Sequence, residues 1–212
     1  RLHQPLEALV ANGDGPKHLD VHFIDQSPSL AIGQAKEELI RTGAFAVQGL
    51  EEAYQYVKTG DKKHAEIAYQ IEDAINNLDR EITSYLVRIS SVNISPAESS
   101  RHVLLMDSIR DIERIGDHFE NIVELTDLRE MNKIDLTDDA MNDLNLMFEL
   151  TIDTVKQAVE ALNTNDMELA RSVAEKEDLI DKMERKYRKN HSVRLNEGAC
   201  SAQSGMVFGD IV

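Results

Sequence analysis

The chain has 212 residues, of which 39 are acidic and 23 basic, and a formal net charge of −16 makes binding to a nucleic-acid phosphate backbone unfavourable. Dense carboxylates attract cations instead, above all hard metal ions. There is no Trp and only four Pro, which favours helices over sheets.

No run approaches the roughly 20 consecutive apolar residues that cross a bilayer. The only cysteine, Cys200, has no partner for an internal disulfide, which predicts a reducing cytoplasm and a small core position for this side chain. The chain begins at Arg1 rather than Met and ends within the apolar stretch 208–212, so we expect further sequence on both sides.

The spacing of apolar residues predicts an extended lead-in followed by six helices. Residues 1–27 contain Pro and Gly and are expected to lie over a surface. Gly60 and Asp61 are typical of a helix end and the next N-cap, Ser95 to Glu98 has the capping-box pattern, and Leu136-Thr137-Asp138 predicts another cap. The predicted helices cover about 29–58, 62–91, 96–126, 139–162 and 167–196, and a sixth begins near Ala199.

The second half of the chain repeats the first. The turn 59–61 corresponds to 164–166, the acidic segment 72–76 corresponds to 177–181, and Arg80 corresponds to Arg185. Slightly out of this register, Asp107 corresponds to Asp210. We therefore predict an all-α fold of tandem duplicated three-helix bundles. The first unit would cover 28–126, a connector 127–138, and an incomplete second unit 139–212.

Pairs of acidic residues four apart recur in both halves and are the candidate metal ligands. Residues at this spacing share a helix face, about 6 Å apart at Cβ, and two carboxylates so placed repel unless a cation bridges them or they reach solvent. The second predicted helix has Asn76 where the other pairs have an acid. The alternative is a set of solvated faces tied to arginines. The candidate ligands are Glu72, Asp107, Asp111, Glu113, Asp117, Glu177, Asp181 and Asp210.

The histidines, a mid-helix glycine and the catalytic motifs are weaker evidence about function than the acidic pairs. His118 and His191 stand near acidic clusters and could complete a metal shell, although the pattern favours an exposed or a core-packed histidine over a metal ligand. Gly116 in mid-helix predicts close approach of a backbone or an ion. There is no catalytic triad, P-loop, dinucleotide glycine motif or pair of Glu-x-x-His motifs, so we predict a protein that is not an enzyme.

The run from Asp111 to His118, with Glu-Arg-Ile-Gly-Asp-His at its centre, resembles the signature of the PhoU family, and the resemblance extends over residues 28–212. It implies a duplicated pair of three-helix bundles, multinuclear iron or zinc clusters held by the acidic pairs, and a role in controlling phosphate uptake. Asn76 departs from the acidic pattern. The segments 16–20, 27–31 and 196–200 look like those of PhoU domains that follow sodium/phosphate cotransporter membrane regions.

Three hypotheses follow. The leading one is a regulatory domain on the cytoplasmic side of the cell membrane, whose partner is the membrane part of a sodium/phosphate cotransporter and whose acidic helices bind metal. The second is a stand-alone adaptor that contacts a phosphate transporter and a sensor kinase. The third is a metal-free bundle that is purely structural or that forms a homodimer.

Overall fold

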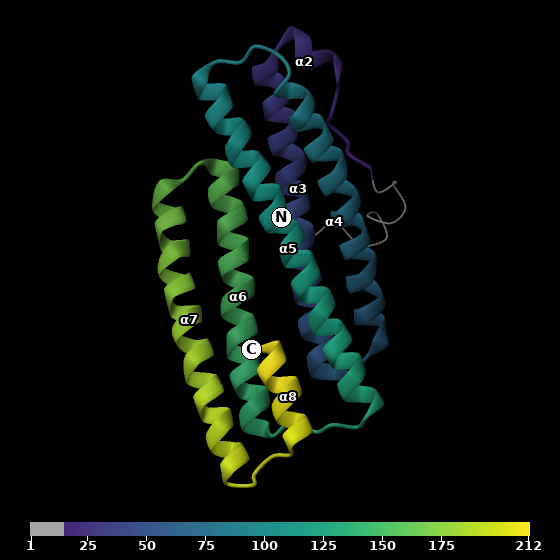
Figure 1. The fold of residues 1–212 in the computed structure, drawn as a ribbon, viewed down its shortest axis with the longest axis vertical. Helices are drawn as coiled ribbons and strands as arrows, with labels where there is room; N and C mark the ends of the chain where they lie inside the picture. Colours follow the sequence, from purple (N-terminus) through teal and green to yellow (C-terminus); the bar gives the residue numbers. More distant parts are fainter. Residues whose placement is uncertain (1–14) are drawn as a thin grey trace. The chain divides into compact units, whose positions relative to one another are not determined.

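The computed structural model describes residues 15–212, and within this range the chain folds into seven helices without a strand (Figure 1). The all-α prediction is confirmed. The first fourteen residues of the expected lead-in lie outside the described part. The helices are α2 (His22–Gln26), α3 (Pro28–Thr59), α4 (Lys62–Ile89), α5 (Pro96–Met131), α6 (Asp138–Thr164), α7 (Met167–Asn196) and α8 (Ala202–Ile211).

The predicted caps explain where these helices begin and end. Gly60 has a φ of +66°, which favours glycine at a helix end. Ser95 and Glu98 exchange backbone-to-side-chain hydrogen bonds at the start of α5, as a capping box requires. The Thr137 and Asp166 side chains accept hydrogen bonds from the first backbone N–H groups of α6 and α7.

Three boundaries differ from prediction. Residues 22–26 of the lead-in form the short helix α2. Helix α5 continues to Met131, so the first part of the expected connector is helical. Helix α8 begins at Ala202 rather than near Ala199, because Ser201 caps it by accepting a hydrogen bond from the Ser204 N–H.

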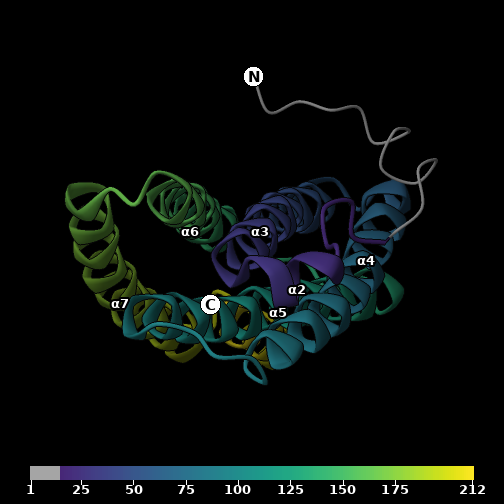
Figure 2. The same ribbon diagram turned by 90° about the horizontal axis from the view of Figure 1, so that it is seen from above.

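Residues 15–46 together with 70–117 form one compact unit, unit 1. It combines α2, the first half of α3, most of α4 and the first two thirds of α5. Figures 1 and 2 show α3, α4 and α5 side by side in this unit, with α2 at the end where α3 begins. Apolar side chains at helical spacing fill its interior, with Leu39, Ile75, Leu78, Ile82 and Ile109 fully buried.

Residues 47–69 and 118–212 form unit 2, in which α6 packs along α7 and α7 contacts α8. The Tyr54 and Phe148 rings stack with their centroids 4.9 Å apart. A Cβ at Gly49 would lie 2.3 Å from the Phe119 ring, so this position requires glycine. The close approach expected at Gly116 is wrong, because a Cβ there would meet Ile75 at an ordinary 3.6 Å.

Cys200 lies half-buried in the bend before α8, so its predicted core position is wrong. The turn that places Ser201 at the helix N-cap leaves its neighbour at the surface. Within residues 15–212, none of the helices has the combination of length and apolarity that crossing a bilayer requires.

Candidate metal centre

Glu72 and Asp117 bring two carboxylates together where α4 and α5 meet in unit 1. Each offers an oxygen within 4.8 Å of the other. Glu72 lies between Ile71 and Ile75 on the apolar stripe of α4 and is only 7% exposed, whereas Asp117 is exposed. One carboxylate is therefore held in place by packing and the other faces the solvent, a geometry that an ion from solution can reach.

Glu120 follows Asp117 by one turn of α5, and the two residues also offer oxygens within 4.8 Å of each other. Because i and i+3 lie on the same face of a helix, the spacing alone brings these side chains together. Glu120 is half-buried. It follows the buried Phe119, whose packing fixes how α5 is turned about its own axis.

Asn76, which departs from the acidic pattern, contacts the Glu72 carboxylate. Its Nδ2 donates a hydrogen bond to Glu72 Oε1 across one turn of α4. The amide therefore orients a predicted ligand and relieves part of its negative charge.

Asp79 and Glu113 extend this acidic group within unit 1. Burial raises the pKa of Glu113, and the nearby Asp117 and Asp79 carboxylates raise it further, while Arg114 acts in the opposite direction. Burial likewise raises the pKa of Asp79, against the Thr83 hydroxyl, Arg110 and Arg80, which lower it. We call Glu72, Asp79, Glu113 and Asp117 the acidic seam.

The acidic seam offers only oxygen donors. Carboxylate oxygens are the ligands of hard cations, and neighbouring carboxylates are destabilised by mutual repulsion until a proton or a cation neutralises them. Burial is the first cause of the raised pKa of Glu113, and the charges of Asp117 and Asp79 add to it, so part of the rise reflects this repulsion. A bound cation would remove it, so the residues present fit a metal centre.

Asp107 and Asp111 lie on the same helix but not on this seam. Both are exposed, and Asp111 stands 3.9 Å from Arg114. Each is two residues away from the buried Ile109. Because an α-helix has 3.6 residues per turn, two residues are roughly half a turn, so both side chains lie on the side of α5 opposite Ile109. Both candidate ligands are therefore exposed to solvent, as the solvated-face alternative expects.

Glu177, Asp181 and Asp210 are exposed in unit 2. Asp181 pairs with Arg185 at 3.8 Å, as the solvated-face alternative expects. Arg188 Nη1 donates a hydrogen bond to the Gly209 carbonyl at 2.9 Å, so α8 reaches the level of Arg188 on α7 as it ends. Among the described residues these three acids are not brought together into one group.

The two histidines lie in different surroundings. His118 is exposed beside Asp117. His191 is buried in unit 2 and its ring stacks on Phe208, with centroids 4.7 Å apart. Burial, and then the charge of Arg194, lowers the pKa of His191. His191 is therefore a core residue of unit 2.

Sequence reasoning missed Asp79 and Glu120. Both could have been found by asking which acids are four residues from a buried stripe position: Asp79 follows Ile75, and Glu120 follows Gly116, each by four. The spacing between acids alone does not distinguish a helix face at a seam from one in solvent.

The fold and this site define an all-helical, acidic, metal-compatible domain without a recognisable catalytic arrangement among the described residues. The profile of the PhoU domain matches residues 39–126 and 144–208, and the chain belongs to the PhoU domain family. The crystal structure of the phosphate transport system regulatory protein PhoU from Streptococcus pneumoniae has the same fold. Its TM-score is 0.77 at 20% identity, over 87% of this chain and 86% of that one.

Two curated relatives differ in length. The phosphate-specific transport system accessory protein PhoU homolog 1 of Thermotoga maritima is 28% identical over 76% of this chain and 69% of its own length. Escherichia coli YjbB, whose name assigns it provisionally to inorganic phosphate export, is 26% identical over 86% of this chain. The chain spans only 33% of YjbB.

Proposed function

We propose that this protein regulates phosphate transport as an accessory component and carries out neither transport nor catalysis itself. Its membership of the PhoU domain family carries this proposal. The name of the Thermotoga maritima relative, an accessory protein of a phosphate-specific transport system, supports it, because this chain covers 69% of that protein. The site of action would be the cytoplasmic side of the cell membrane, where such a transport system can be contacted.

The second part of the proposal concerns metal. Glu72, Glu113 and Asp117, with Asp79 beside them, would hold a cation centre, in the form of the iron or zinc cluster that the sequence resemblance implies. Asn76 would keep the Glu72 carboxylate in position. A bound cation would supply positive charge on an acidic surface and so make contact with phosphate or an anionic partner favourable.

Phosphate uptake tests the regulatory role. The gene would be deleted in its own host, and uptake of radiolabelled phosphate measured at low and high external phosphate. A regulator's loss makes uptake insensitive to the external supply, and the wild-type gene restores the response. If the dependence of uptake on external phosphate is unchanged by the deletion, the proposal is wrong.

Elemental analysis of protein purified without chelator tests the metal centre. We expect iron or zinc in the wild type and a loss of at least tenfold in Glu72→Gln/Asp117→Asn. The matched control is Glu177→Gln/Asp181→Asn, the corresponding exposed pair on α7, which should keep the metal. A wild type free of metal, or equal losses in the two variants, contradicts this site.

A second candidate is the regulatory domain of a larger phosphate carrier, including a sodium/phosphate cotransporter. The observation that favours it is the match to YjbB, in which a segment of this length makes up a third of a longer protein. Sequencing the complete reading frame around this chain distinguishes the two candidates: apolar runs of about 20 residues indicate a carrier. A homodimer is compatible with either candidate, and light scattering measures it directly.

A further inference from the structure

Three residues of unit 2 carry most of the buried polar atoms that have no hydrogen-bond partner. Within residues 15–212 there are seven such side-chain atoms, and five of them belong to His191 and Arg194 on α7 and Ser204 on α8. They are both ring nitrogens of His191, the Nε and Nη2 of Arg194, and the Ser204 hydroxyl oxygen. Because these residues offer N–H and O–H groups, we call them the donor cluster.

The donor cluster surrounds the Phe208 ring where α7 contacts α8. The His191 ring stacks on Phe208, and the Arg194 guanidinium lies over the same ring, 5.2 Å from its centroid. Ser204 precedes Phe208 by four residues and so shares its face of α8. A Cβ at Gly205 would lie 2.8 Å from His191 Nε2, so glycine allows the two helices to approach closely here.

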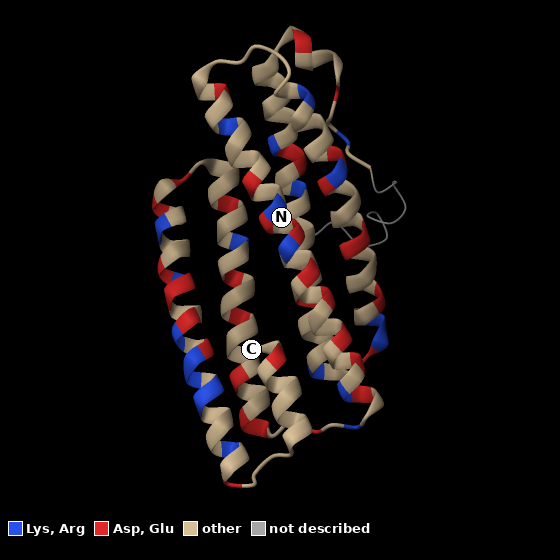
Figure 3. Cartoon of the chain, in the orientation of Figure 1, with Lys and Arg blue, Asp and Glu red and all other residues tan. Residues whose placement is uncertain are grey.

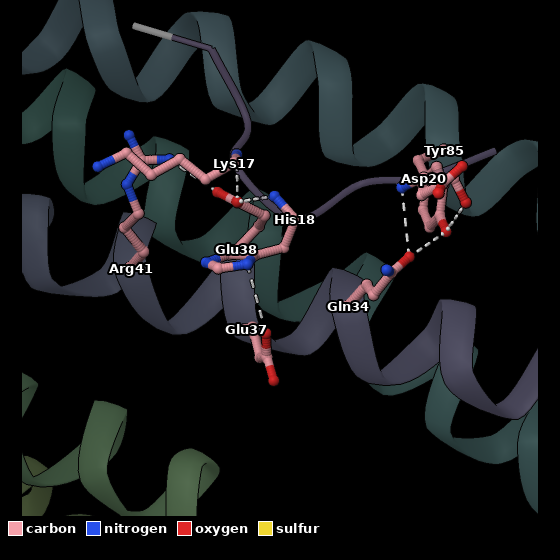
Figure 4. A network of polar contacts seen from close by, with 8 residues as sticks. All are labelled: Lys17, His18, Asp20, Gln34, Glu37, Glu38, Arg41 and Tyr85. Atoms are coloured by element: carbon pink, nitrogen blue, oxygen red, sulfur yellow. Dashed lines mark hydrogen bonds and ion pairs between the residues drawn. The ribbon is translucent and has the colours of Figure 1, made fainter. Parts of the chain in front are cut away.

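Burial makes the unpartnered atoms costly. Ser204 is 1% exposed and His191 is 6% exposed, so neither side chain reaches water for a partner. The fully buried Glu38 in unit 1 shows the usual solution, since its carboxylate accepts hydrogen bonds from two backbone N–H groups and from Arg41 (Figure 4). The donor cluster departs from this pattern, and a bound ligand would supply the partners that the protein does not.

The unpartnered atoms of Arg194 lie on one edge of its guanidinium. On the other side, Nη1 donates a hydrogen bond to Asp143 Oδ2 at 2.9 Å, which holds the group in place. The Nε–H and one N–H of Nη2 point in the same direction, and this edge binds oxyanions through two parallel hydrogen bonds. The edge with no protein partner is therefore the one suited to an anion.

The chemistry of the donor cluster selects the ligand. Two N–H groups of Arg194 and the Ser204 hydroxyl need acceptor oxygens in different directions, which a tetrahedral oxyanion supplies. Burial, and then the charge of Arg194, lowers the pKa of His191, so the ring is neutral at pH 7.5 and one of its nitrogens is an acceptor. Hydrogen phosphate has an O–H group that can donate to this nitrogen, whereas sulfate has none.

We propose that His191, Arg194 and Ser204 form a binding site for inorganic phosphate between α7 and α8. The Arg194 edge holds two phosphate oxygens, the Ser204 hydroxyl donates to a third, and the phosphate O–H donates to His191. The choice of phosphate rests in part on the proposed function, whereas the arrangement of the donors does not. The site belongs to unit 2, the acidic seam belongs to unit 1, and phosphate binding here needs no metal.

Entry of phosphate requires α8 to move away from α7, because the atoms of the donor cluster are shielded from solvent. Helix α8 has only ten residues, and the connection to α7 contains Gly198, whose φ of +69° favours glycine. Near its end, α8 is held by the hydrogen bond from Arg188 Nη1 to the Gly209 carbonyl at 2.9 Å. Phosphate that contacts both helices should therefore tighten α8 against α7.

Titration of the wild-type protein with inorganic phosphate at pH 7.5 and constant ionic strength tests the site. Prior treatment with a chelator removes metal, so that phosphate cannot bind through a cation at the acidic seam. In ¹⁵N-labelled protein the Nε–H resonance of Arg194 should shift and reach saturation. Sulfate should bind about tenfold more weakly, because it lacks the O–H donor.

Variants of the donor cluster, compared by isothermal titration calorimetry, separate this site from general charge effects. Arg194→Lys keeps a positive charge for Asp143 but removes the two-donor edge, and phosphate should bind about tenfold more weakly or worse. Ser204→Ala, which removes one hydroxyl, should weaken binding about fivefold. The matched control is Arg185→Lys, an exposed arginine on the same helix, which should bind phosphate within about twofold of the wild type.

Three outcomes overturn the proposal. The first, which needs no variant, is an Arg194 Nε–H resonance that phosphate leaves unchanged, because water would then satisfy the donors. The second is equal weakening in Arg194→Lys and Arg185→Lys, which would indicate attraction to charge alone. The third is equal affinity for sulfate and phosphate. A protein that controls phosphate uptake but shows any of these results keeps the proposed function and lacks this site.

Discussion

Helices α4 and α7 carry acidic residues at corresponding positions of the sequence repeat, but their surroundings differ. On the part of α4 in unit 1, Ile71, Ile75, Leu78 and Ile82 are buried, and Glu72 lies among them. On α7 only Tyr187 and His191 are buried. Figure 3 shows acidic and basic residues interspersed along α7, and its Asp181 is exposed and paired with Arg185.

The difference is that a second helix brings a further carboxylate to Glu72, whereas among the described residues no such group includes Glu177 or Asp181. On α4 the carboxylates meet those of α5, and the pKa of Glu113 rises as a result of burial and of this meeting. On α7 an arginine one turn away neutralises Asp181 in solvent, which contributes little to stability. The following experiments test this contrast.

The largest effect is expected for a core residue of α4. Ile75 is fully buried, so Ile75→Ala should lower the free energy of unfolding by about 2–5 kcal/mol. Ile180, its counterpart on α7, is only half-buried, and Ile180→Ala should cost about half as much. Urea unfolding followed by circular dichroism measures both. Equal losses would mean that α7 is as well packed as α4.

The next largest difference is expected between two of the ion pairs of α7, one nearly buried and one exposed. Arg194 and Asp143 are both 12% exposed and lie 2.9 Å apart, so Arg194→Met leaves a nearly buried carboxylate unpaired. This should cost about 2–4 kcal/mol. Arg185→Met, which removes an exposed pair, should change stability by less than about 0.5 kcal/mol. Comparable urea midpoints for the two variants would contradict the assignment of burial along α7.

A bound metal ion should stabilise the folded protein through its ligand on α4, and the acidic residues of α7 should not contribute. A cation present at 100 times its dissociation constant adds about 2.7 kcal/mol to the stability of a protein that binds it only when folded. Thermal unfolding with iron, zinc or EDTA should show this gain for the wild type and for Glu177→Gln/Asp181→Asn. Glu72→Gln/Asp117→Asn should lose it. If the metal still stabilises Glu72→Gln/Asp117→Asn, the ion binds elsewhere in the protein.

The smallest effect is a pH dependence in unit 2. Burial, and then the charge of Arg194, lowers the pKa of His191. The other groups nearby are Asp143, which accepts a hydrogen bond from Arg194, and Tyr187, which lies one turn before His191 on α7. The unfolded chain therefore binds the proton more readily. Stability should be greatest above the ordinary histidine pKa of 6.5 and fall as the pH drops through and below it.

Urea midpoints at pH 7.5 and 5.5 measure this dependence. His191→Phe preserves an aromatic ring against Phe208 and removes the titrating group, so part of the pH dependence should disappear with it. If the wild type and this variant lose the same stability on acidification, other groups are responsible. The comparison of midpoints within each protein removes the cost of the substitution itself.

Much of the helical structure was predictable. Apolar spacing and capping residues predicted five helices to within a few residues at most ends, because helix starts and stops depend on local backbone hydrogen bonds. The short helix α2 and the extension of α5 were not predicted, since neither has a strong local signal. The boundaries of the tandem repeat stay a prediction, and the two compact units divide α3, α4 and α5 instead.

Of the predicted ligands, Glu72, Glu113 and Asp117 lie in the acidic seam, and spacing along the helices did not separate them from Asp107, Asp111, Glu177, Asp181 and Asp210. Spacing along one helix is a local property that the chain alone determines, together with composition, charge and helix boundaries. Tertiary packing decided which acids meet, because only the neighbouring helix supplies the opposing carboxylate and excludes water. It also decided that a fully buried Glu38 would bind the backbone of its own chain.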